Sequence, residues 1–414
     1  MKIAIATAVY YPQINGVAVF SHNLAVGLAK RGNEVMVICP SQTGKSYTRM
    51  VDGVKTVYLK SIEAKVYPDQ IHDVPEKRKV FGVKLPRLFY KNGFRVSVFP
   101  YPEIKKVLDE FKPDVVHVQI SDPIGLSVVS YARKRGIPVV TTEHNQPEVL
   151  TEPLHMPGIV RKPTNALLSA YFRNRQSKSD FVTMPTEMAI RNLIKDGTEF
   201  PVPVAAVSNG VDLSDFKPGK VTPSLYEKYG LDKDLKTVLY LGRLDPEKKV
   251  GMVVEAFLRA EKELDKIQLV IVGDGVDKVH LMKMAEGHSN IHFLGRITPP
   301  ELYEVYKFGD VFATASEIET QGIVLIEAAA CGLPLIAVDK GAVAEVCQNG
   351  KNGYLCEPGS VSEIAKAIVK ILKDEKLRIT FSKKSLEIAQ EHDFEGTLDK
   401  FTNIYKKVIE KSPS

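Results

Sequence analysis

The chain has 414 residues, a length that predicts two or three domains, each with a core of its own. Its 44% hydrophobic and 26% charged residues are typical of a globular protein and exclude a disordered chain. No apolar run reaches ~18 residues, so we expect no membrane-spanning helix. The four cysteines lack the spacing of a metal site, and we interpret them as buried thiols.

The first half of the chain alternates between strand-like and helix-like segments. A strand over Lys2–Ala6 precedes a helix over Val17–Lys30, and a second strand follows over Glu34–Cys39. Further strands are predicted at Val115–Val118, Pro138–Thr142 and Phe181–Met184, with a helix at Ser127–Arg135. This alternation predicts a parallel, doubly wound sheet.

Residues 76–106 carry an excess of basic side chains. Nine lysines and arginines stand against two glutamates there, a net charge of +7 compared with +6 for the whole chain, and aromatic residues lie between them. Such a segment can bind the anionic face of a bilayer. A solvated loop is the alternative, and nucleic acid is not expected because no nucleic-acid motif accompanies the charge.

A second segment, residues 161–178, has basic residues and no acid. We predict an interfacial helix over Lys162–Lys178, because apolar side chains form a stripe and basic ones flank it. The stripe consists of Leu167, Leu168, Tyr171 and Phe172, flanked by Arg161, Lys162, Arg173, Arg175 and Lys178. Packing of the stripe into a domain core is the alternative.

The strand and helix pattern restarts in the second half. We place the crossover between domains at Val204–Val207 and Ser208–Asp212. Strands are predicted at Val238–Leu241, Gln268–Val272, Ile291–Leu294, Val311–Ala313 and Leu335–Val338, with helices at Val250–Glu263, Val361–Lys373 and Glu395–Glu410.

Late in the chain, a predicted helix start has an acidic residue on each side. The helix covers Ile323–Cys331, so that Glu319 lies in the preceding loop and Glu327 about one turn inside the helix. The N–H groups of Gly322 and Ile323 stand at the positive end of the helix and form an anion site. Carboxylates beside it suit a sugar joined to a diphosphate, because each can accept from a pair of hydroxyls. Solvated surface charges are the alternative.

A second charged cluster follows the predicted strand at Val238–Leu241. Gly242 comes directly after this strand, and Arg243 and Lys248 lie in the next residues. Open α/β sheets bind ligands at the carboxyl ends of their strands, so both cations are candidates for an anionic ligand. An ordinary exposed loop is the alternative, but two such clusters in one half of the chain make coincidence a poor explanation.

Several motifs, in order and spacing, resemble those of the retaining glycosyltransferases of family 4. They are Tyr11–Gly16, Pro113–Gln119, Thr142–Asn145, Ser208–Pro218, Ile271–Gly275 and the block with Glu319 and Glu327. The resemblance covers nearly the whole chain. It implies the GT-B fold, an α/β architecture of two facing Rossmann-like, doubly wound parallel-sheet domains with a cleft between them. It places an acceptor-binding domain at 1–203, a nucleotide-sugar-binding domain at 204–390, and a terminal segment, 391–414, that returns to the first domain.

The resemblance also implies roles for individual residues. Arg243 and Lys248 match the residues that contact the donor diphosphate, and His144 matches a histidine that contacts the donor sugar. Glu319 is then expected to hold the sugar hydroxyls and Glu327 the ribose. Other expected donor contacts are Gly16, where a side chain would block close approach, Arg296 near the base, Gln321, Gly322 and Ile323.

The tetrapeptide Glu319–Gly322 resembles the branch of the family that glycosylates membrane lipids such as diacylglycerol. We therefore expect a retaining hexosyltransferase that moves glucose or a related hexose from a nucleotide diphosphate sugar to such a lipid. Glu143 and Asn145 depart from the common pattern around His144 and leave other acceptors open: a soluble sugar, a polysaccharide or phosphatidylinositol, with GDP-mannose as a donor. A binder of nucleotide sugars without enzymatic activity is a third hypothesis.

Neither a metal nor another cofactor is expected, because GT-B enzymes generally stabilise the leaving diphosphate with cations and helix ends. Asp232-Lys-Asp234 fits a metal motif by its letters but lies in a polar loop. Gly273-Asp-Gly275 lacks the third glycine of a dinucleotide fingerprint, which disfavours an oxidoreductase. We expect a cytoplasmic protein, peripheral on the inner face of the plasma membrane.

Overall fold

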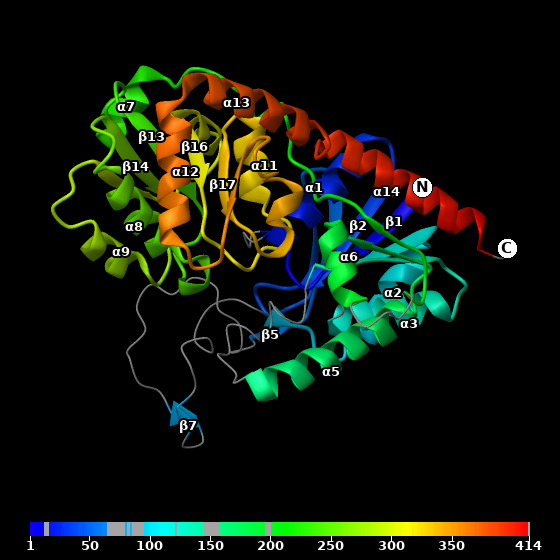
Figure 1. The fold of residues 1–414 in the computed structure, drawn as a ribbon. Coiled ribbons are helices and arrows are strands. Elements are labelled where there is room, and N and C mark those ends of the chain that lie inside the picture. The colour runs from blue at the N-terminus through cyan, green and yellow to red at the C-terminus, as the bar shows by residue number, and fades with distance from the viewer. Residues whose placement is uncertain are drawn as a thin grey trace. The chain divides into compact units, whose positions relative to one another are not determined.

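The computed structural model describes residues 1–11, 16–63, 79–80, 83–84, 95–120, 122–144, 158–194 and 200–412, with only the backbone at 79–80 and 83–84. Within this part the chain forms two compact units (Figure 1). Unit 1 comprises Met1–Ser208 and Thr397–Ser414, and unit 2 comprises Asn209–Gly396. None of the described helices is long and apolar enough to cross a membrane.

Unit 1 is built on an eight-stranded sheet with the order β12-β11-β10-β9-β1-β2-β4-β3. All neighbours are parallel except β3 and β4, which form an antiparallel pair. The strand order reverses between β1 and β9. The strands are β1 Lys2–Ala6, β2 Glu34–Pro40, β3 Tyr47–Val51, β4 Val54–Leu59, β9 Val115–Val118, β10 Val139–Thr142, β11 Phe181–Met184 and β12 Val204–Ala206.

Helices cover both faces of this sheet because successive side chains of a strand point to opposite faces. In β9, Val116 and Val118 are buried in a core with α2 and α3, whereas the ring of His117 between them contacts Phe401 and Tyr405 of α14. The helices are α1 Gly16–Lys30, α2 Tyr101–Phe111, α3 Pro123–Arg133, α5 Gly158–Gln176, α6 Glu187–Leu193 and α14 Phe394–Glu410. Two short ladders pair β5 Ile62–Glu63 with β8 Arg95–Val96, and β6 Lys79–Val80 with β7 Val83–Lys84.

Helix α3 and strand β12 of unit 1 differ from the sequence expectation, and α5 covers Gly158–Gln176 where Lys162–Lys178 was predicted. Helix α3 begins before the predicted start at Ser127, because Asp122 caps it by accepting the Gly125 N–H at 2.8 Å. The first turn of a helix tolerates a proline such as Pro123, because the missing N–H would have no partner there. Val204–Ala206, which we expected in the crossover between domains, pairs with β11 as a strand of unit 1.

Unit 2 is built on a six-stranded sheet with the order β15-β14-β13-β16-β17-β18, parallel throughout. Its order reverses between β13 and β16. The strands are β13 Lys236–Leu241, β14 Ile267–Val272, β15 Ile291–Gly295, β16 Val311–Ala313, β17 Leu335–Val338 and β18 Gly353–Cys356. Both predictions of a doubly wound parallel sheet are therefore confirmed.

Two hydrophobic clusters lie on opposite faces of this second sheet. Val238 and Tyr240 belong to one cluster, and Leu239 between them belongs to the other. The helices are α7 Pro223–Tyr229, α8 Val250–Ala260, α9 Lys278–Met284, α10 Glu301–Val305, α11 Ile323–Ala330, α12 Val361–Lys373 and α13 Glu375–Gln390, with short 3-10 turns η3 Pro246–Lys248, η4 Tyr306–Phe308 and η5 Gly341–Glu345. In Figure 1, α12 and α11 flank the strands of this sheet.

Candidate active site

The candidate site lies where the strand order of unit 2 reverses. Strands β13 and β16 are neighbours and parallel, so the loops that follow them leave the same edge of the sheet side by side. Doubly wound sheets bind their ligands at such switch points, at the carboxyl ends of the strands. The loop after β13 carries Arg243 and Lys248, and the loop after β16 carries Glu319.

Glycines hold the loop after β13 close to the loop after β14. A Cβ at Gly273 would lie 1.8 Å from the Gly242 carbonyl oxygen, and one at Gly275 would lie 2.4 Å from the Leu244 oxygen. The N–H of Leu244 in turn donates to the Asp274 oxygen at 2.9 Å. Gly273 and Gly275, which resembled part of a dinucleotide fingerprint, thus serve backbone packing beside the site.

Lys248 and Glu319 form an ion pair between the two loops. Lys248 Nζ lies 2.7 Å from Glu319 Oε1, and both side chains are mostly buried, with 18% and 17% of their surface exposed. The structure therefore brings these two predicted donor contacts together. A ligand that placed an anionic group on Lys248 and a pair of hydroxyls on Glu319 would replace this ion pair.

Arg243 lies at the same strand end, but its guanidinium engages acids of its own loop. It pairs with Asp245, and its Nη2 lies 2.7 Å from Glu247 Oε1. The side chain stays half exposed. Burial raises the pKa of the Asp245 carboxyl, and the charge of Arg243 opposes that rise.

The start of α11 follows the Glu319 loop. Gly322 caps the helix with φ +77°, a left-handed conformation that favours glycine, and Ile323 is the first helical residue. The first N–H groups of an α-helix have no carbonyl partner within the helix, so this end can accept an anion. Gln321 is buried, and its Oε1 accepts the Asn209 N–H at 3.2 Å, so it ties the loop to the start of unit 2.

Glu327 lies one turn inside α11 and is half-buried. Its Oε2 accepts the Tyr306 hydroxyl at 2.5 Å. Burial raises the pKa of Glu327 to about 7, against the hydrogen bond from Tyr306, which lowers it. Near neutral pH the carboxyl can therefore change its charge.

Glu317 is a further residue of this site that the sequence analysis did not single out. Its carboxylate pairs with Lys249 and lies 2.9 Å from Lys340 Nζ, so it joins the loops after β13, β16 and β17. Burial acts to raise the pKa of Glu317, but the hydrogen bonds from Lys249 and Lys340 outweigh it and lower the pKa. Its position two residues before Glu319 in the same loop was the available signal.

Arg296 follows β15 and is exposed. Strand β14 lies between β15 and β13, so Arg296 stands two strands away from Arg243 in the sheet. Its expected place near the base stays a prediction.

Unit 1 holds the predicted residues Gly16 and His144. Gly16 is the first residue of α1, and a Cβ there would meet no atom of the described residues within 4 Å. Packing among the described residues therefore gives no reason for glycine at this position. Most of the motif Tyr11–Gly16 lies outside the described residues.

His144 is buried at the end of β10 and hydrogen-bonded. Its Nε2 lies 2.8 Å from Gln119 Oε1, and its ring meets the Phe20 ring edge-on at 5.3 Å. Burial lowers the pKa of His144 to about 3, so its imidazole is neutral at physiological pH. The Gln119 amide nitrogen lies 3.2 Å from Nε2 of His117, whose Nδ1 is 2.7 Å from the Tyr405 hydroxyl.

No cluster of three or more His, Cys, Asp or Glu side chains that could hold a metal occurs among the described residues. In the Asp232-Lys-Asp234 segment, Asp232 accepts the N–H of Asp234 at 2.8 Å, as in an exposed polar turn.

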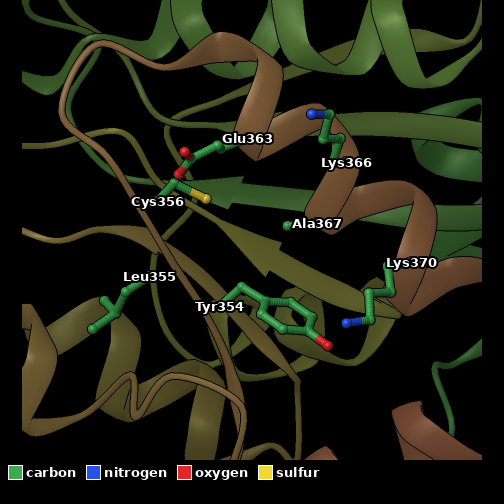
Figure 2. Close-up of a pocket in the computed structure, with 7 residues that line it drawn as sticks. All are labelled: Tyr354, Leu355, Cys356, Glu363, Lys366, Ala367 and Lys370. Atoms are coloured by element: carbon green, nitrogen blue, oxygen red, sulfur yellow. The ribbon is translucent and has the colours of Figure 1, made fainter.

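Unit 2 also has a surface hollow of about 200 Å³ beside β18 and α12 (Figure 2). None of the predicted donor residues lines it. The Lys370 ammonium lies 4.7 Å from the centre of the Tyr354 ring, and Glu363 accepts the Glu357 N–H at 2.8 Å. These side chains are thus engaged locally, at the edge of the sheet and away from the switch point.

Family models and known proteins match both halves of the chain. A family model described as "Glycosyltransferase Family 4" matches residues 14–215, and one described as "Glycosyl transferases group 1" matches residues 222–387. Alpha-monoglucosyldiacylglycerol synthase of Acholeplasma laidlawii is 28% identical, over 100% of this chain and 98% of the relative. The enzyme of that name from Streptococcus pneumoniae is 30% identical, over 81% of this chain and 71% of the relative.

Solved structures resemble the whole chain. Anabaena HepE in complex with UDP and glucose has a TM-score of 0.68 at 17% identity, over 98% of this chain and 100% of that one. Sucrose-phosphate synthase of Thermosynechococcus elongatus reaches a TM-score of 0.73 at 17% identity, over 99% and 100%. These likenesses confirm the predicted GT-B fold class.

Proposed function

Because this chain belongs to the glycosyltransferases of family 4, we propose that it moves glucose from UDP-glucose to a membrane lipid such as diacylglycerol. The two relatives named above make monoglucosyldiacylglycerol, which supports glucose as the sugar and diacylglycerol as the acceptor. UDP and glucose in the complex of HepE support a uridine donor.

The observation that carries the proposal is the Lys248–Glu319 pair at the switch point of unit 2. In the proposed complex, Lys248 and Arg243 contact the diphosphate together with the start of α11, and Glu319 takes hydroxyls of the sugar. As the bond between sugar and diphosphate breaks, negative charge grows on the diphosphate, and fixed cations and helix N–H groups stabilise it. No metal or other cofactor is needed in this scheme.

Glu327 is proposed to accept from the ribose hydroxyls. An ionised carboxylate has two oxygens that can each accept a hydrogen bond from a neighbouring hydroxyl. In the protonated form, one of these oxygens carries the proton and acts as a donor. Donor binding should therefore favour ionised Glu327. The predicted contact of His144 with the sugar and retention at the anomeric carbon belong to the same proposal.

A lipid acceptor calls for a protein surface that can meet a membrane, and α5 offers one. Of the predicted stripe, Phe172 is buried at 8% exposure, but Leu167 and Tyr171 are exposed at 72% and 40%. The core alternative thus applies to the buried Phe172 and in part to Leu168, which is half-buried. With the basic residues of 161–178 alongside, this face supports peripheral binding to anionic lipid, proposed at the inner face of the plasma membrane. Of the other basic segment, 76–106, the structure describes only residues 79–80, 83–84 and 95–106.

A panel of donors and acceptors tests this function. Purified protein is incubated with UDP-glucose, UDP-galactose or GDP-mannose, and with diacylglycerol, phosphatidylinositol or a soluble glucoside in detergent micelles. We expect glucosyldiacylglycerol from UDP-glucose as the main product. The matched control is Glu319→Gln, which should bind vesicles as the native protein does but form little product.

Other outcomes decide against parts of the proposal. A product from phosphatidylinositol or from the soluble sugar alone would replace the acceptor but keep the chemistry. Release of no nucleoside diphosphate from any donor, even slowly and without acceptor, would argue for a binder of nucleotide sugars and overturn transfer itself.

A further inference from the structure

A cavity of about 510 Å³ lies in unit 1, lined by α3, the end of α5 and the strands β9 and β10 (Figure 1 shows the two helices). None of the predicted donor residues lines it. The residues that line it divide into an uncharged group and a basic group. The uncharged group consists of the apolar Val118, Gly125, Leu126 and Val129 together with the hydroxyl-bearing Ser130 and Thr141. The basic group consists of Arg133, Lys134, Arg175 and Lys178.

The basic group is only partly neutralised. Arg133 Nη1 lies 3.0 Å from Asp180 Oδ1, and its Nε donates to the Lys178 carbonyl at 2.7 Å. The Lys134 ammonium stands 5.1 Å from the centre of the Tyr101 ring. No ion pair joins Lys134, Arg175 or Lys178 to a carboxylate within the described part of the chain. The cavity therefore attracts an anion.

Arg175 indicates the kind of anion. Its Nε is buried and has no hydrogen-bond partner among the described residues, while its guanidinium lies 4.9 Å from the centre of the Tyr171 ring. A buried N–H without an acceptor is unfavourable, and the planar guanidinium fork matches two oxygens of one phosphate. A phosphate in the cavity would supply the missing acceptor.

The apolar surroundings indicate what carries the phosphate. Val160, Leu167 and Tyr171 are spaced by seven and four residues, so they share one face of α5, and all three are exposed. Tyr171, at the end of this exposed apolar row, lies one helical turn before Arg175 at the cavity. A free anion has no apolar part to contact such a row, whereas a phospholipid has acyl chains beside its phosphate.

We propose that this cavity binds the phosphate of an anionic phospholipid head group while α5 lies on the membrane surface. This inference rests on the proposed function at a lipid surface and adds a specific lipid site to it. The head group would hold unit 1 at membranes rich in anionic lipid, where a lipid acceptor is available.

Vesicle binding by the full chain tests the site. The vesicles consist of phosphatidylcholine with increasing phosphatidylglycerol, and binding is followed by co-sedimentation. Arg175→Gln with Lys178→Gln is compared with Arg161→Gln with Lys162→Gln, which removes the same charge from the other end of α5. Each basic residue near an anionic surface contributes about fivefold to binding, so the control pair also weakens binding. We expect the cavity pair to lose about tenfold more than the control pair, as for a lost charge-assisted hydrogen bond.

Variants at Ser130 separate the cavity from the general surface charge. Ser130 is exposed on α3 and lines the cavity, so Ser130→Phe fills it without a change of charge. This variant should lose selectivity for phosphatidylglycerol, and Ser130→Glu should lose it further through repulsion of the phosphate. Equal losses for the two double variants, or native binding by both folded Ser130 variants, would overturn the site.

Soluble phosphates identify the source of the anion. Calorimetry with inorganic phosphate and with glycerol phosphate should give weak heats, because neither brings acyl chains. If either binds tightly and displaces the protein from phosphatidylglycerol vesicles, the cavity belongs to a free phosphate and the lipid assignment fails. Glucosyl transfer in neutral detergent micelles tests the proposed function separately, since it needs no anionic lipid.

Discussion

Lys248 Nζ and Glu319 Oε1 lie 2.7 Å apart although 71 residues separate them in the chain. The contact is possible because β13 and β16 are adjacent and parallel, so the loops after them meet at the point where the strand order reverses. In this pair, the ammonium of Lys248 and the carboxylate of Glu319 neutralise each other. A donor that places diphosphate on the lysine and hydroxyls on the glutamate must replace that pair with contacts of its own.

A double-mutant cycle measures this relationship. We expect Lys248→Met and Glu319→Gln each to lower kcat/KM by an amount that corresponds to about 2.7–4 kcal/mol of lost transition-state stabilisation. This is the usual effect of removing one preorganised electrostatic contact. Because the two groups share a contact, the double variant should cost less than the sum of the single ones, by about 0.5–3 kcal/mol. Arg259→Met, in a solvated pair with Glu255 on α8, is the matched control and should change kcat/KM little. Strict additivity would mean that the pair is not coupled in the transition state.

Glu317 is predicted to contribute to stability and, through the three loops, to donor binding. Its Oε atoms serve Lys249 and Lys340, and only 11% of the side chain is exposed, so Glu317→Gln should lower the free energy of unfolding by about 1–3 kcal/mol. Urea denaturation at pH 7 measures this. The exposed Glu255→Gln serves as control.

The same variant has a pH signature. The pKa of Glu317 is lower in the folded protein than its ordinary value of 4.5, because the hydrogen bonds from Lys249 and Lys340 outweigh burial. Its stabilisation is therefore fully present above pH 4.5 and is lost as the pH falls through the folded pKa. The difference in unfolding free energy between native protein and Glu317→Gln should shrink below pH 4.5. A difference that stays constant to pH 3 would contradict the charge-based account.

Glu327 is predicted to lower the stability of the protein near neutral pH while it contributes to donor binding. Its pKa is raised to about 7 by burial, so the folded protein retains a proton that the unfolded chain has released above pH 4.5. Stability from this group is thus lost as the pH rises from about 4.5 to 7. Glu327→Gln cannot ionise, so its free energy of unfolding should be about 3 kcal/mol higher than that of the native protein at pH 8 and about equal at pH 4.

The activity of that variant should change in the opposite direction. If ionised Glu327 accepts from the ribose, Glu327→Gln raises KM for the donor about tenfold or more, in line with a lost hydrogen bond to a charged group. Initial rates at varied donor concentration give this value. Unchanged KM together with the gain in stability would assign Glu327 a structural place only.

The sequence allowed the sheets to be predicted because parallel, buried strands are short apolar runs that alternate with amphipathic helices. Val238–Leu241 and Val311–Ala313 were recognised this way, and with them the two loops that meet at the site. Strands at the margins of the sheets, such as β3 with its exposed residues Thr48–Met50, have no such pattern and were missed. Helix α3 was placed too late because a cap by Asp122 depends on geometry more than on apolar spacing.

For the site, residue type and position after a strand were sufficient to select Lys248 and Glu319. The ion-pair partners of the charged side chains, however, could not be predicted. Arg243 was expected to point to the diphosphate, whereas its fork holds Asp245 and Glu247 in its own loop. Glu317 was overlooked because its two lysines come from loops that only the strand order brings together. Pairing across loops depends on this topology, which no local pattern contains.

Gln119 is predicted to be a positioning residue for His144. It lies 2.8 Å from Nε2 of His144, and burial holds the pKa of this histidine at about 3. Between pH 5 and 8 His144 should therefore stay neutral, with the proton on Nε2 and an acceptor at Nδ1. Gln119→Leu removes the partner, so the ring should mix both tautomers in its ¹⁵N spectrum, and kcat should fall by up to about 10²-fold through misplacement. Gln119→Glu keeps an acceptor and adds a negative charge, so it should restore the tautomer, raise the pKa of His144 and recover part of kcat. If the spectrum changes as expected while kcat stays native in both variants, the tautomer of His144 has no part in transfer.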